Sequence, residues 1–292
     1  MIIKTGFQVG LRLCIGPTRL NGTCFSLSSL HPLFPVPATL IPSRPRLHRR
    51  LLQSSFSVSS RFGEIEREMG MSREIIRKAE NLVERSMKGN DPSHDPPHVW
   101  RVRDLALSLA RDQGLSSNSD SMLVIELAAL LHDIGDYKYL TDPSEEDIVE
   151  NFLEEEGLEE DKKMRILSII KRMGFKDELA GLVTGENSLE FGIVQDADRL
   201  DAIGAIGIAR CFAFSGSRNK ALHNPAILPR SDLSKDQYMK KEDQTAVNHF
   251  HEKLLKLKDL MKTEAGRKRA EKRHQFMEEF LNEFYEEWEG RA

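Results

Sequence analysis

The sequence predicts an all-α fold, and three observations support that prediction. Apolar residues recur at intervals of three and four along most of residues 72–290, the spacing of one face of an α-helix. No segment alternates apolar and polar residues convincingly enough to predict a strand. Clusters of Pro, Gly, Ser and Asn separate several of the periodic segments. We therefore expect a succession of helices, without a repeat of fixed period.

The first two helices of this region have recognisable ends. A helix is expected over residues 72–89, where Ser72 can accept a hydrogen bond from a free N–H and Glu74 suits the helix dipole. A second helix follows a Pro-rich segment, with Pro97 in its first turn, and stops at Gly114. Its apolar face consists of Val99, Val102, Leu105, Ala106 and Leu109.

The middle of the chain contains the most apolar helices. Residues 119–136 (SDSMLVIELAALLHDIGD) are apolar on nearly every side, so this helix belongs in the middle of a domain. His132 and Asp133 stand at its C-terminal end. An acidic helix and a short further helix are expected within residues 141–173. Residues 189–216 predict one long apolar helix, in which the glycines of GAIGIA would allow close helix packing.

The C-terminal part of the chain predicts a loop followed by two long amphipathic helices. Residues 215–235 are rich in Gly, Ser, Asn and Pro, and a loop of this length is typically functional or mobile. Residues 236–262 and 263–288 each contain an apolar stripe between charged positions. The first stripe includes Leu254, Leu257 and Met261, and the second includes Phe276, Phe280 and Phe284.

Residues 1–68 differ in composition from the rest of the chain. No Asp or Glu precedes Glu64, whereas Arg, Ser, Pro and Leu are frequent. This composition is typical of an organelle transit peptide, so we expect a disordered segment that directs the protein to the chloroplast or mitochondrion. The alternatives are a disordered tail on a cytoplasmic protein, or a true start at Met69 or Met71.

Composition excludes some functional classes. Hydrophobic residues make up 39% of the chain and charged residues 30%, and no apolar run is long enough to predict a membrane span. Residues 1–68, the basic head, are followed by a region with more acidic than basic residues. This negative net charge disfavours broad nucleic-acid binding. Cys211 is the one cysteine after residue 68, so no disulfide is expected within the rest of the chain. We expect Cys211 to be a buried, unreactive thiol.

Ionisable residues stand on or beside the most apolar predicted helices. Burying such groups is costly unless they are paired or bind a metal. Histidine nitrogen with carboxylate oxygen suits Mn²⁺, Fe²⁺, Co²⁺, Ni²⁺ or Zn²⁺, and carboxylate-rich sites also accept Mg²⁺. Taken singly, each of these residues more often has another role, the histidines in packing, at a helix end or on the surface, and the aspartates on a solvated face. The candidates are His94, His98, His132, Asp133, Asp196, Asp198 and Asp201.

The order His, His-Asp, Asp on successive helices is similar to the signature of the HD superfamily of metal-dependent phosphohydrolases. The resemblance extends over roughly residues 75–285 and is carried by SHDPPHVWRV, ALLHDIGDYKY, VQDADRLDAIGAIGIAR and KLLKLKDLMKTEAGRKRAEKRHQFM. These stretches resemble bacterial HD proteins that cleave nucleoside triphosphates, and their plant relatives. The resemblance implies an HD-domain helical bundle over residues 72–290, ending in long helices.

The resemblance also implies one divalent metal ion, which would be Mn²⁺, Mg²⁺, Co²⁺, Ni²⁺ or Fe²⁺. The implied ligands are His98, His132, Asp133 and Asp198. The sequence ADRL matches the stretch that supplies the last ligand in related enzymes, which selects Asp198 over Asp196 and Asp201. Those two would then orient neighbouring groups. Asp136 matches the position of a catalytic carboxylate that is often Glu, so it is implied in catalysis together with Asp133.

The implied substrate is a small phosphate compound, most simply a nucleotide. A water activated by the metal would attack phosphorus, and Asp136 would handle its proton. Nearby cations would offset the developing charge, although each is equally compatible with a solvated surface position. The candidate substrate contacts are His94, Arg101, Lys138, Lys253 and Lys256.

Two other functions stay open at this point. The chain could be a phosphomonoesterase or phosphodiesterase acting on another phosphate ester, because the motif indicates metal binding but does not determine which phosphate bond is hydrolysed. It could also be a non-catalytic HD module that senses a nucleotide, because a shared fold does not determine activity. No Walker loop or Rossmann fingerprint offers a competing catalytic motif. A homo-oligomer formed through the C-terminal helices is compatible with the sequence.

Overall fold

The computed structural model describes residues 48–135, 147–175, 178, 188–230 and 244–292, and for residues 48–62, 64 and 65 it describes the backbone alone. The chain divides into a unit of Met1–Ser54 and a unit of Ser55–Ala292. Every regular element among the described residues is a helix, which confirms the all-α prediction. Asp136, Lys138 and residues 1–47 of the head lie outside the described residues.

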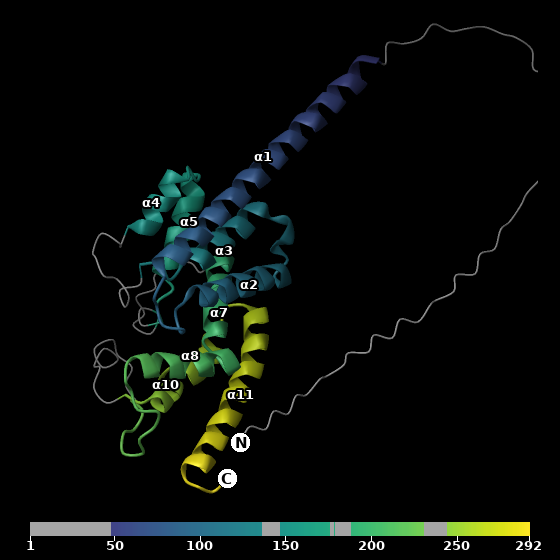
Figure 1. Ribbon diagram of the computed structural model, residues 1–292. Helices are drawn as coiled ribbons and strands as arrows, with labels where there is room; N and C mark the ends of the chain where they lie inside the picture. The colour runs from purple at the N-terminus through teal and green to yellow at the C-terminus, as the bar shows by residue number, and fades with distance from the viewer. Residues whose placement is uncertain (1–47, 136–146, 176–177, 179–187, 231–243) are drawn as a thin grey trace, which may run out of the picture. The chain divides into compact units, whose positions relative to one another are not determined.

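The helices are labelled in Figure 1. They are α1 (His48–Ser86), α2 (Pro96–Asp112), α3 (Ser119–Leu131), α4 (Ile148–Glu155), α5 (Glu160–Lys171), α7 (Leu189–Asp201), α8 (Gly204–Ser217), α10 (Ala246–Glu252) and α11 (Glu264–Trp288). Two 3₁₀ segments, η1 (Leu115–Ser117) and η3 (Leu254–Leu260), complete the described elements.

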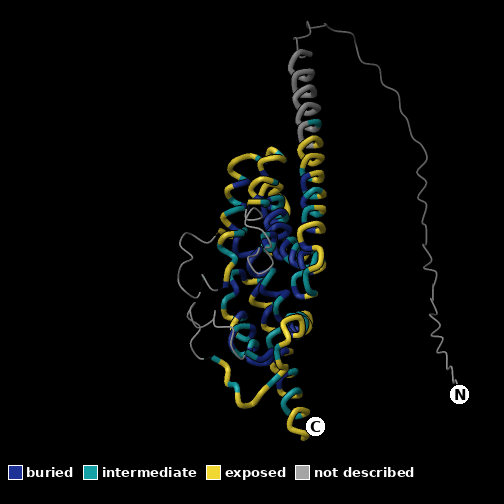
Figure 2. Tube along the Cα trace, turned by 60° about the vertical axis from the view of Figure 1, so that its left-hand side comes forward, coloured by how far each residue is buried: buried dark blue, intermediate teal, exposed yellow. Residues whose placement is uncertain are grey.

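The centre of the larger unit is built from α2, α3 and α7, which pack against one another. Helix α3 is buried along most of its length, as its lack of a polar face predicts. Buried residues follow these inner helices, whereas the end of α11 is exposed (Figure 2). Helix α11 packs on α8, η3 and α7 and closes the bundle on one side. The inner helices therefore hold their polar side chains inside an apolar core.

Side-chain caps explain where the inner helices begin. The carboxylate of Asp95 accepts a hydrogen bond from the backbone N–H of His98, and Pro96 opens α2. The side chain of Asn118 accepts from the N–H of Ser121 at the start of α3. Helix α2 ends before Gly114, whose φ of 79° is strained for other residues. Both helices thus begin close to where the sequence predicts, and α2 also ends there, whereas α3 ends at Leu131, before His132 and Asp133.

Two predicted helix boundaries are wrong. Helix α1 begins at His48, so Ser72 lies inside it and is not its N-cap. Residues 236–262 do not form one long helix, because α10 begins after the cap residue Thr245 and ends at Glu252. The chain then continues as the 3₁₀ segment η3, in which Leu254 and Leu257 are both buried. A 3₁₀ turn brings residues three apart onto one side, so both leucines can face the core.

The long helix expected over residues 189–216 is in fact two helices. Helices α7 and α8 are bent by 69° relative to each other. The break lies at Gly204, which has a φ of 75° and so takes a conformation that side chains disfavour. A Cβ atom at Gly207 would collide with the carbonyl of Ala202. These glycines therefore permit the bend and do not lie in the middle of one helix.

No single described helix is long and apolar enough to cross a membrane, and just the bent pair of α7 and α8 reaches that length and composition together. Cys211 is buried on α8, with its Sγ 3.5 Å from the carbonyl oxygen of Ala246. Burial raises the pKa of its thiol to about 12. It is therefore the unreactive core residue that the sequence predicts.

Asp196 joins the centre of the bundle to the start of α11. Its Oδ1 accepts from the N–H of Lys262 at 2.8 Å, and its Oδ2 accepts from the N–H and hydroxyl of Thr263 at 2.8 and 2.7 Å. Thr263 in turn caps α11 by accepting from the N–H of Gly266. This fully buried carboxylate thus has a structural role, which separates it from the metal-ligand candidates.

Replacing Gly266 with Ala should destabilise the protein, because the added Cβ would collide with the carboxylate of Asp196 and crowd Thr263. We expect the free energy of unfolding to fall by about 1–3 kcal/mol. Gly216→Ala is the matched control, since Gly216 lies in α8 with open space around it and should be neutral or stabilised by up to about 1 kcal/mol. Urea denaturation measures both, and equal stability of the two variants would contradict this role of Asp196.

Candidate metal centre

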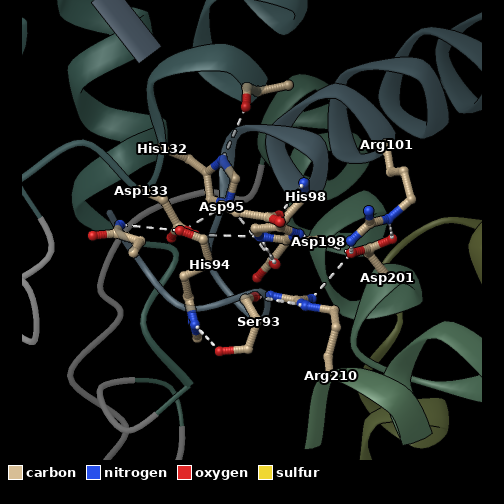
Figure 3. Close-up of polar contacts among 12 residues, drawn as sticks. Ser93, His94, Asp95, His98, Arg101, His132, Asp133, Asp198, Asp201 and Arg210 are labelled. Carbon is tan, nitrogen blue, oxygen red and sulfur yellow. Dashed lines mark hydrogen bonds and ion pairs between the residues drawn. The ribbon is translucent and has the colours of Figure 1, made fainter. Parts of the chain in front are cut away.

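Two buried imidazoles face each other at the middle of the bundle. His98 lies in the first turns of α2 and is fully buried, and His132 directly follows α3 as its C-cap. Their ring centroids are 5.5 Å apart, with the ring planes inclined by 75°. Figure 3 shows both rings directed toward the carboxylates of Asp133 and Asp198. The packing of α2 against α3 therefore brings distant residues of the chain into one site.

The Nδ1 atoms of both rings have fixed partners on the side away from this centre. His98 Nδ1 lies 2.8 Å from Oδ2 of Asp201, and His132 Nδ1 lies 2.9 Å from the carbonyl oxygen of Ala129. A carbonyl or carboxylate oxygen accepts, so each Nδ1 donates its proton. The Nε2 atom of each neutral ring then presents a lone pair to the centre, which is the tautomer that a metal-binding histidine requires.

Two carboxylates approach the same Nε2 atoms. Asp133 places Oδ2 at 3.2 Å from Nε2 of His98 and Oδ1 at 3.4 Å from Nε2 of His132. Oδ1 of Asp198, on α7, lies 3.6 and 3.8 Å from the same two nitrogens. Neighbouring ligands about 2.1 Å from one ion are about 3.0–3.4 Å apart, so these spacings are close to those of a coordination shell.

Unsatisfied polar atoms indicate that a ligand fits this centre. Among the described residues, Nε2 of His98, Nε2 of His132 and Oδ2 of Asp133 are buried without a hydrogen-bond partner. Buried polar atoms in this state are costly unless something pairs with them. The ligand atoms of His98, His132 and Asp198 lie within 4.8 Å of one another. Nitrogen and carboxylate donors in this arrangement could hold a divalent metal ion.

The electrostatics of the centre favour a cation. Burial raises the pKa of Asp133, but the nearby imidazoles of His132 and His98 outweigh this effect, and the pKa lies well below its usual value. Burial lowers the pKa of His98, yet the neighbouring carboxylates of Asp133 and Asp201 bring it above the ordinary value. The negative field that favours a proton on His98 would equally attract a metal ion.

Asp201 connects the centre to two arginines. Arg101 contacts both of its oxygens, with Nε 2.8 Å from Oδ1 and Nη2 3.0 Å from Oδ2. Arg210 on α8 donates to Oδ2 at 3.1 Å and to the backbone oxygen of Ser93 at 2.7 Å. Burial raises the pKa of Asp201, but its bonds with His98 and these arginines depress it far below the usual value. Arg101 thus holds Asp201, and its predicted contact with substrate stays a prediction.

Sequence reasoning missed Arg210. A signal was present, because Arg210 is the one charged residue in the apolar stretch IGIARCFAF. A charge that is buried in such a stretch requires a partner, and the break before α8 brings it back to Asp201.

The other predicted substrate contacts lie at different positions. His94 is close to the centre, since its ring is 6.0 Å from that of His98 and 6.1 Å from that of Phe214. Lys253 lies over the ring of Phe175 at 5.2 Å. Lys256 is exposed. Asp136 and Lys138 follow Gly135 and fall outside the described residues.

A group of basic residues lies beside Phe214 and His249. One of them, Lys253, is among the substrate contacts that the sequence predicts. We call Arg218, Lys220, Arg230 and Lys253 the basic rim. Arg218 and Lys220 lie 5.4 and 5.9 Å from the ring of Phe214. Burial lowers the pKa of His249, and together with the positive charges of Lys253, Lys220 and Arg230 it brings this pKa to about 3. The rim therefore gathers around His249 and Phe214, on the side of His94.

Comparison with known proteins identifies the family. Residues 97–203 match the HD domain family, a range that contains His98, His132, Asp133 and Asp198. The Bacillus subtilis protein YpgQ is 36% identical over 220 residues, which cover 74% of this chain and 96% of YpgQ.

Solved structures agree with this match. A Lactobacillus plantarum protein has a TM-score of 0.65 at 34% identity, covering 74% of this chain and 97% of its own. An HD-superfamily hydrolase from Bacillus thuringiensis has a TM-score of 0.56 at 38% identity, covering 75% and 98%. YpgQ in complex with ADP has a TM-score of 0.55 at 30% identity, covering 74% and 96%. The chain therefore belongs to the HD superfamily of hydrolases.

Proposed function

We propose that this protein is a metal-dependent phosphohydrolase that hydrolyses nucleotides in the manner of a nucleoside triphosphate pyrophosphohydrolase. The observation that supports it best is the convergence of unpartnered, buried ligand atoms from His98, His132 and Asp133 beside Asp198. Packing alone does not explain such a centre, because each buried polar atom without a hydrogen-bond partner destabilises the fold.

In this proposal His98, His132, Asp133 and Asp198 hold one divalent ion, with Mn²⁺, Mg²⁺, Co²⁺, Ni²⁺ and Fe²⁺ as candidates. Such an ion polarises a phosphate oxygen and lowers the pKa of a water. Asp198 is preferred to its neighbours because Asp196 accepts hydrogen bonds from Thr263, the N-cap of α11, and Asp201 is hydrogen-bonded to Nδ1 of His98. Asp136 remains the proposed proton acceptor, since it follows Asp133 by three residues.

A nucleotide substrate has two supports. YpgQ, which is 30% identical in the solved structure, was crystallised in complex with ADP. The ring of Phe214 contacts His94 on one side and the rim residues Arg218 and Lys220 on another. A phosphate chain that starts at the metal centre would therefore run toward cations. Of the predicted substrate contacts, Lys253 belongs to this rim. Arg101 instead donates to the carboxylate of Asp201.

Replacing Asp198 with Ala should abolish metal binding and lower hydrolysis by more than about 100-fold, because it removes a proposed ligand while leaving the packing of the core unchanged. Metal content by mass spectrometry and turnover of dATP with Mn²⁺ measure the two effects. Asp104→Ala is the control, since this exposed carboxylate also lies on a helix of the bundle but away from the centre. Full turnover by Asp198→Ala would refute the proposed ligand set.

The products should identify the bond that is broken. Incubation of the metal-loaded protein with dATP should release pyrophosphate and dAMP, because we propose cleavage between the α- and β-phosphates. Anion chromatography separates pyrophosphate from orthophosphate. Release of orthophosphate from dATP or from dAMP would instead favour a phosphomonoesterase, and no turnover of any phosphate compound would favour a nucleotide-sensing module.

Asp201→Asn should weaken metal binding by about 10–100-fold, because an amide does not hold the Nδ1 proton of His98 as a carboxylate does. Since Asp201 positions a ligand and does not itself bind the metal, excess Mn²⁺ should restore most of the turnover. Activity titrated against Mn²⁺ concentration measures this shift. A loss of activity that excess Mn²⁺ leaves unchanged would contradict a positioning role.

A further inference from the structure

A surface cavity that is open to solvent lies away from the metal centre. Its volume is about 960 Å³. It is lined by the end of α2, the turn between α7 and α8, and the first half of α11. None of the proposed metal ligands or members of the basic rim lines it.

Four cations from two turns of α11 line this cavity, against two carboxylates. They are Lys268, Arg269, Lys272 and Arg273, and the carboxylates are Asp112 and Glu264. Arg269 is paired with Asp112 at 2.6 Å, but no ion pair is seen for Lys268 or Lys272 among the described residues. The cavity therefore has an excess of positive charge.

The same cations lie beside the positive end of a helix. Arg273 packs against Gly204, because a Cβ there would come within 3.0 Å of the Arg273 side chain. Gly204 begins α8, a helix of 14 residues whose first turn has no side-chain cap. A helix N-terminus carries partial positive charge, which adds to the positive charge of these side chains.

Arg273 is influenced by charges of both signs. Burial lowers the pKa of its guanidinium, the charge of Asp201 raises it, and the charge of Arg269 lowers it. The guanidinium donates to the backbone oxygen of Leu200, which leaves further donors for a ligand. An anion in the cavity would offset the repulsion between these groups and satisfy those donors.

Two exposed apolar side chains line the same cavity. Phe276 on α11 is 47% exposed, and Ile206 on α8 is 44% exposed. Phe276 lies one turn beyond Lys272 on the same helix. An exposed aromatic ring next to clustered cations suits a ligand that combines phosphate groups with a flat ring, since bases stack on aromatic side chains.

We propose that this cavity is a second binding site, and that it takes a nucleotide. Lys268, Lys272 and Arg273 would contact its phosphates, and Phe276 would contact its base. The site is separate from the hydrolytic centre and does not depend on the proposed function. The site nevertheless lies beside the end of α7, because Arg273 donates to the backbone oxygen of Leu200. The next residue, Asp201, accepts the hydrogen bond from Nδ1 of His98.

Calorimetric titration of the full chain with ADP, in the presence of EDTA, tests the proposal. Wild type should bind ADP without a metal, and Lys268→Glu/Lys272→Glu should bind at least about tenfold more weakly, because two attractive charges become repulsive. The matched control is Lys88→Glu/Lys171→Glu, which makes the same charge change at exposed lysines outside the cavity. Equal affinity of all three proteins, or no binding by wild type, would overturn the proposal.

A second variant tests the nucleotide assignment without a change in charge. Phe276→Ala should weaken ADP binding by about tenfold while binding pyrophosphate like wild type, because stacking on the base is lost and the cations remain. Phe276 is exposed, so its removal should leave the fold intact, which a thermal melt checks. Unchanged ADP affinity in Phe276→Ala would show that the site does not recognise a nucleoside.

Discussion

The hydrogen bond between His98 and Asp201 is the interaction on which the rest of the structure depends. His98 is fully buried, so its Nδ1 proton requires an acceptor inside the bundle. Asp201 supplies it, and Arg101 and Arg210 neutralise the charge that this carboxylate brings into the core. One carboxylate thus connects α2, α7 and α8 and directs Nε2 of His98 toward the centre. The same bond contributes to folding and to the geometry of the site.

Helix α7 uses three carboxylates for three different purposes. Successive residues of a helix are rotated by about 100°, so Asp196 lies on a different side of α7 from Asp198 and Asp201, which are three residues apart. Asp196 holds the start of α11, Asp198 approaches the two histidines, and Asp201 fixes His98. Asp198 and Asp201 approach opposite nitrogens of the same ring, Nε2 and Nδ1 of His98. The spacing of the three residues therefore distributes their roles.

Much of the fold could be predicted from the sequence, because local signals determine it. Side-chain caps such as Asp95 and Asn118 define helix starts, and the apolar surface of α3 predicts its burial. The break at Gly204 was not predictable from periodicity, since a glycine inside an apolar run is compatible with a continuous helix. Similarly, the pairing of Arg101 with Asp201 and the assembly of the basic rim depend on tertiary contacts between distant residues.

We propose that one divalent ion is held between α2, α3 and α7. The most direct measurement is a crystal structure of the protein with Mn²⁺, in which anomalous scattering locates the metal. We predict one peak about 2.0–2.3 Å from Nε2 of His98 and His132 and from oxygens of Asp133 and Asp198. No peak at this position, or a metal bound instead by Asp196 or Asp201, would contradict the account.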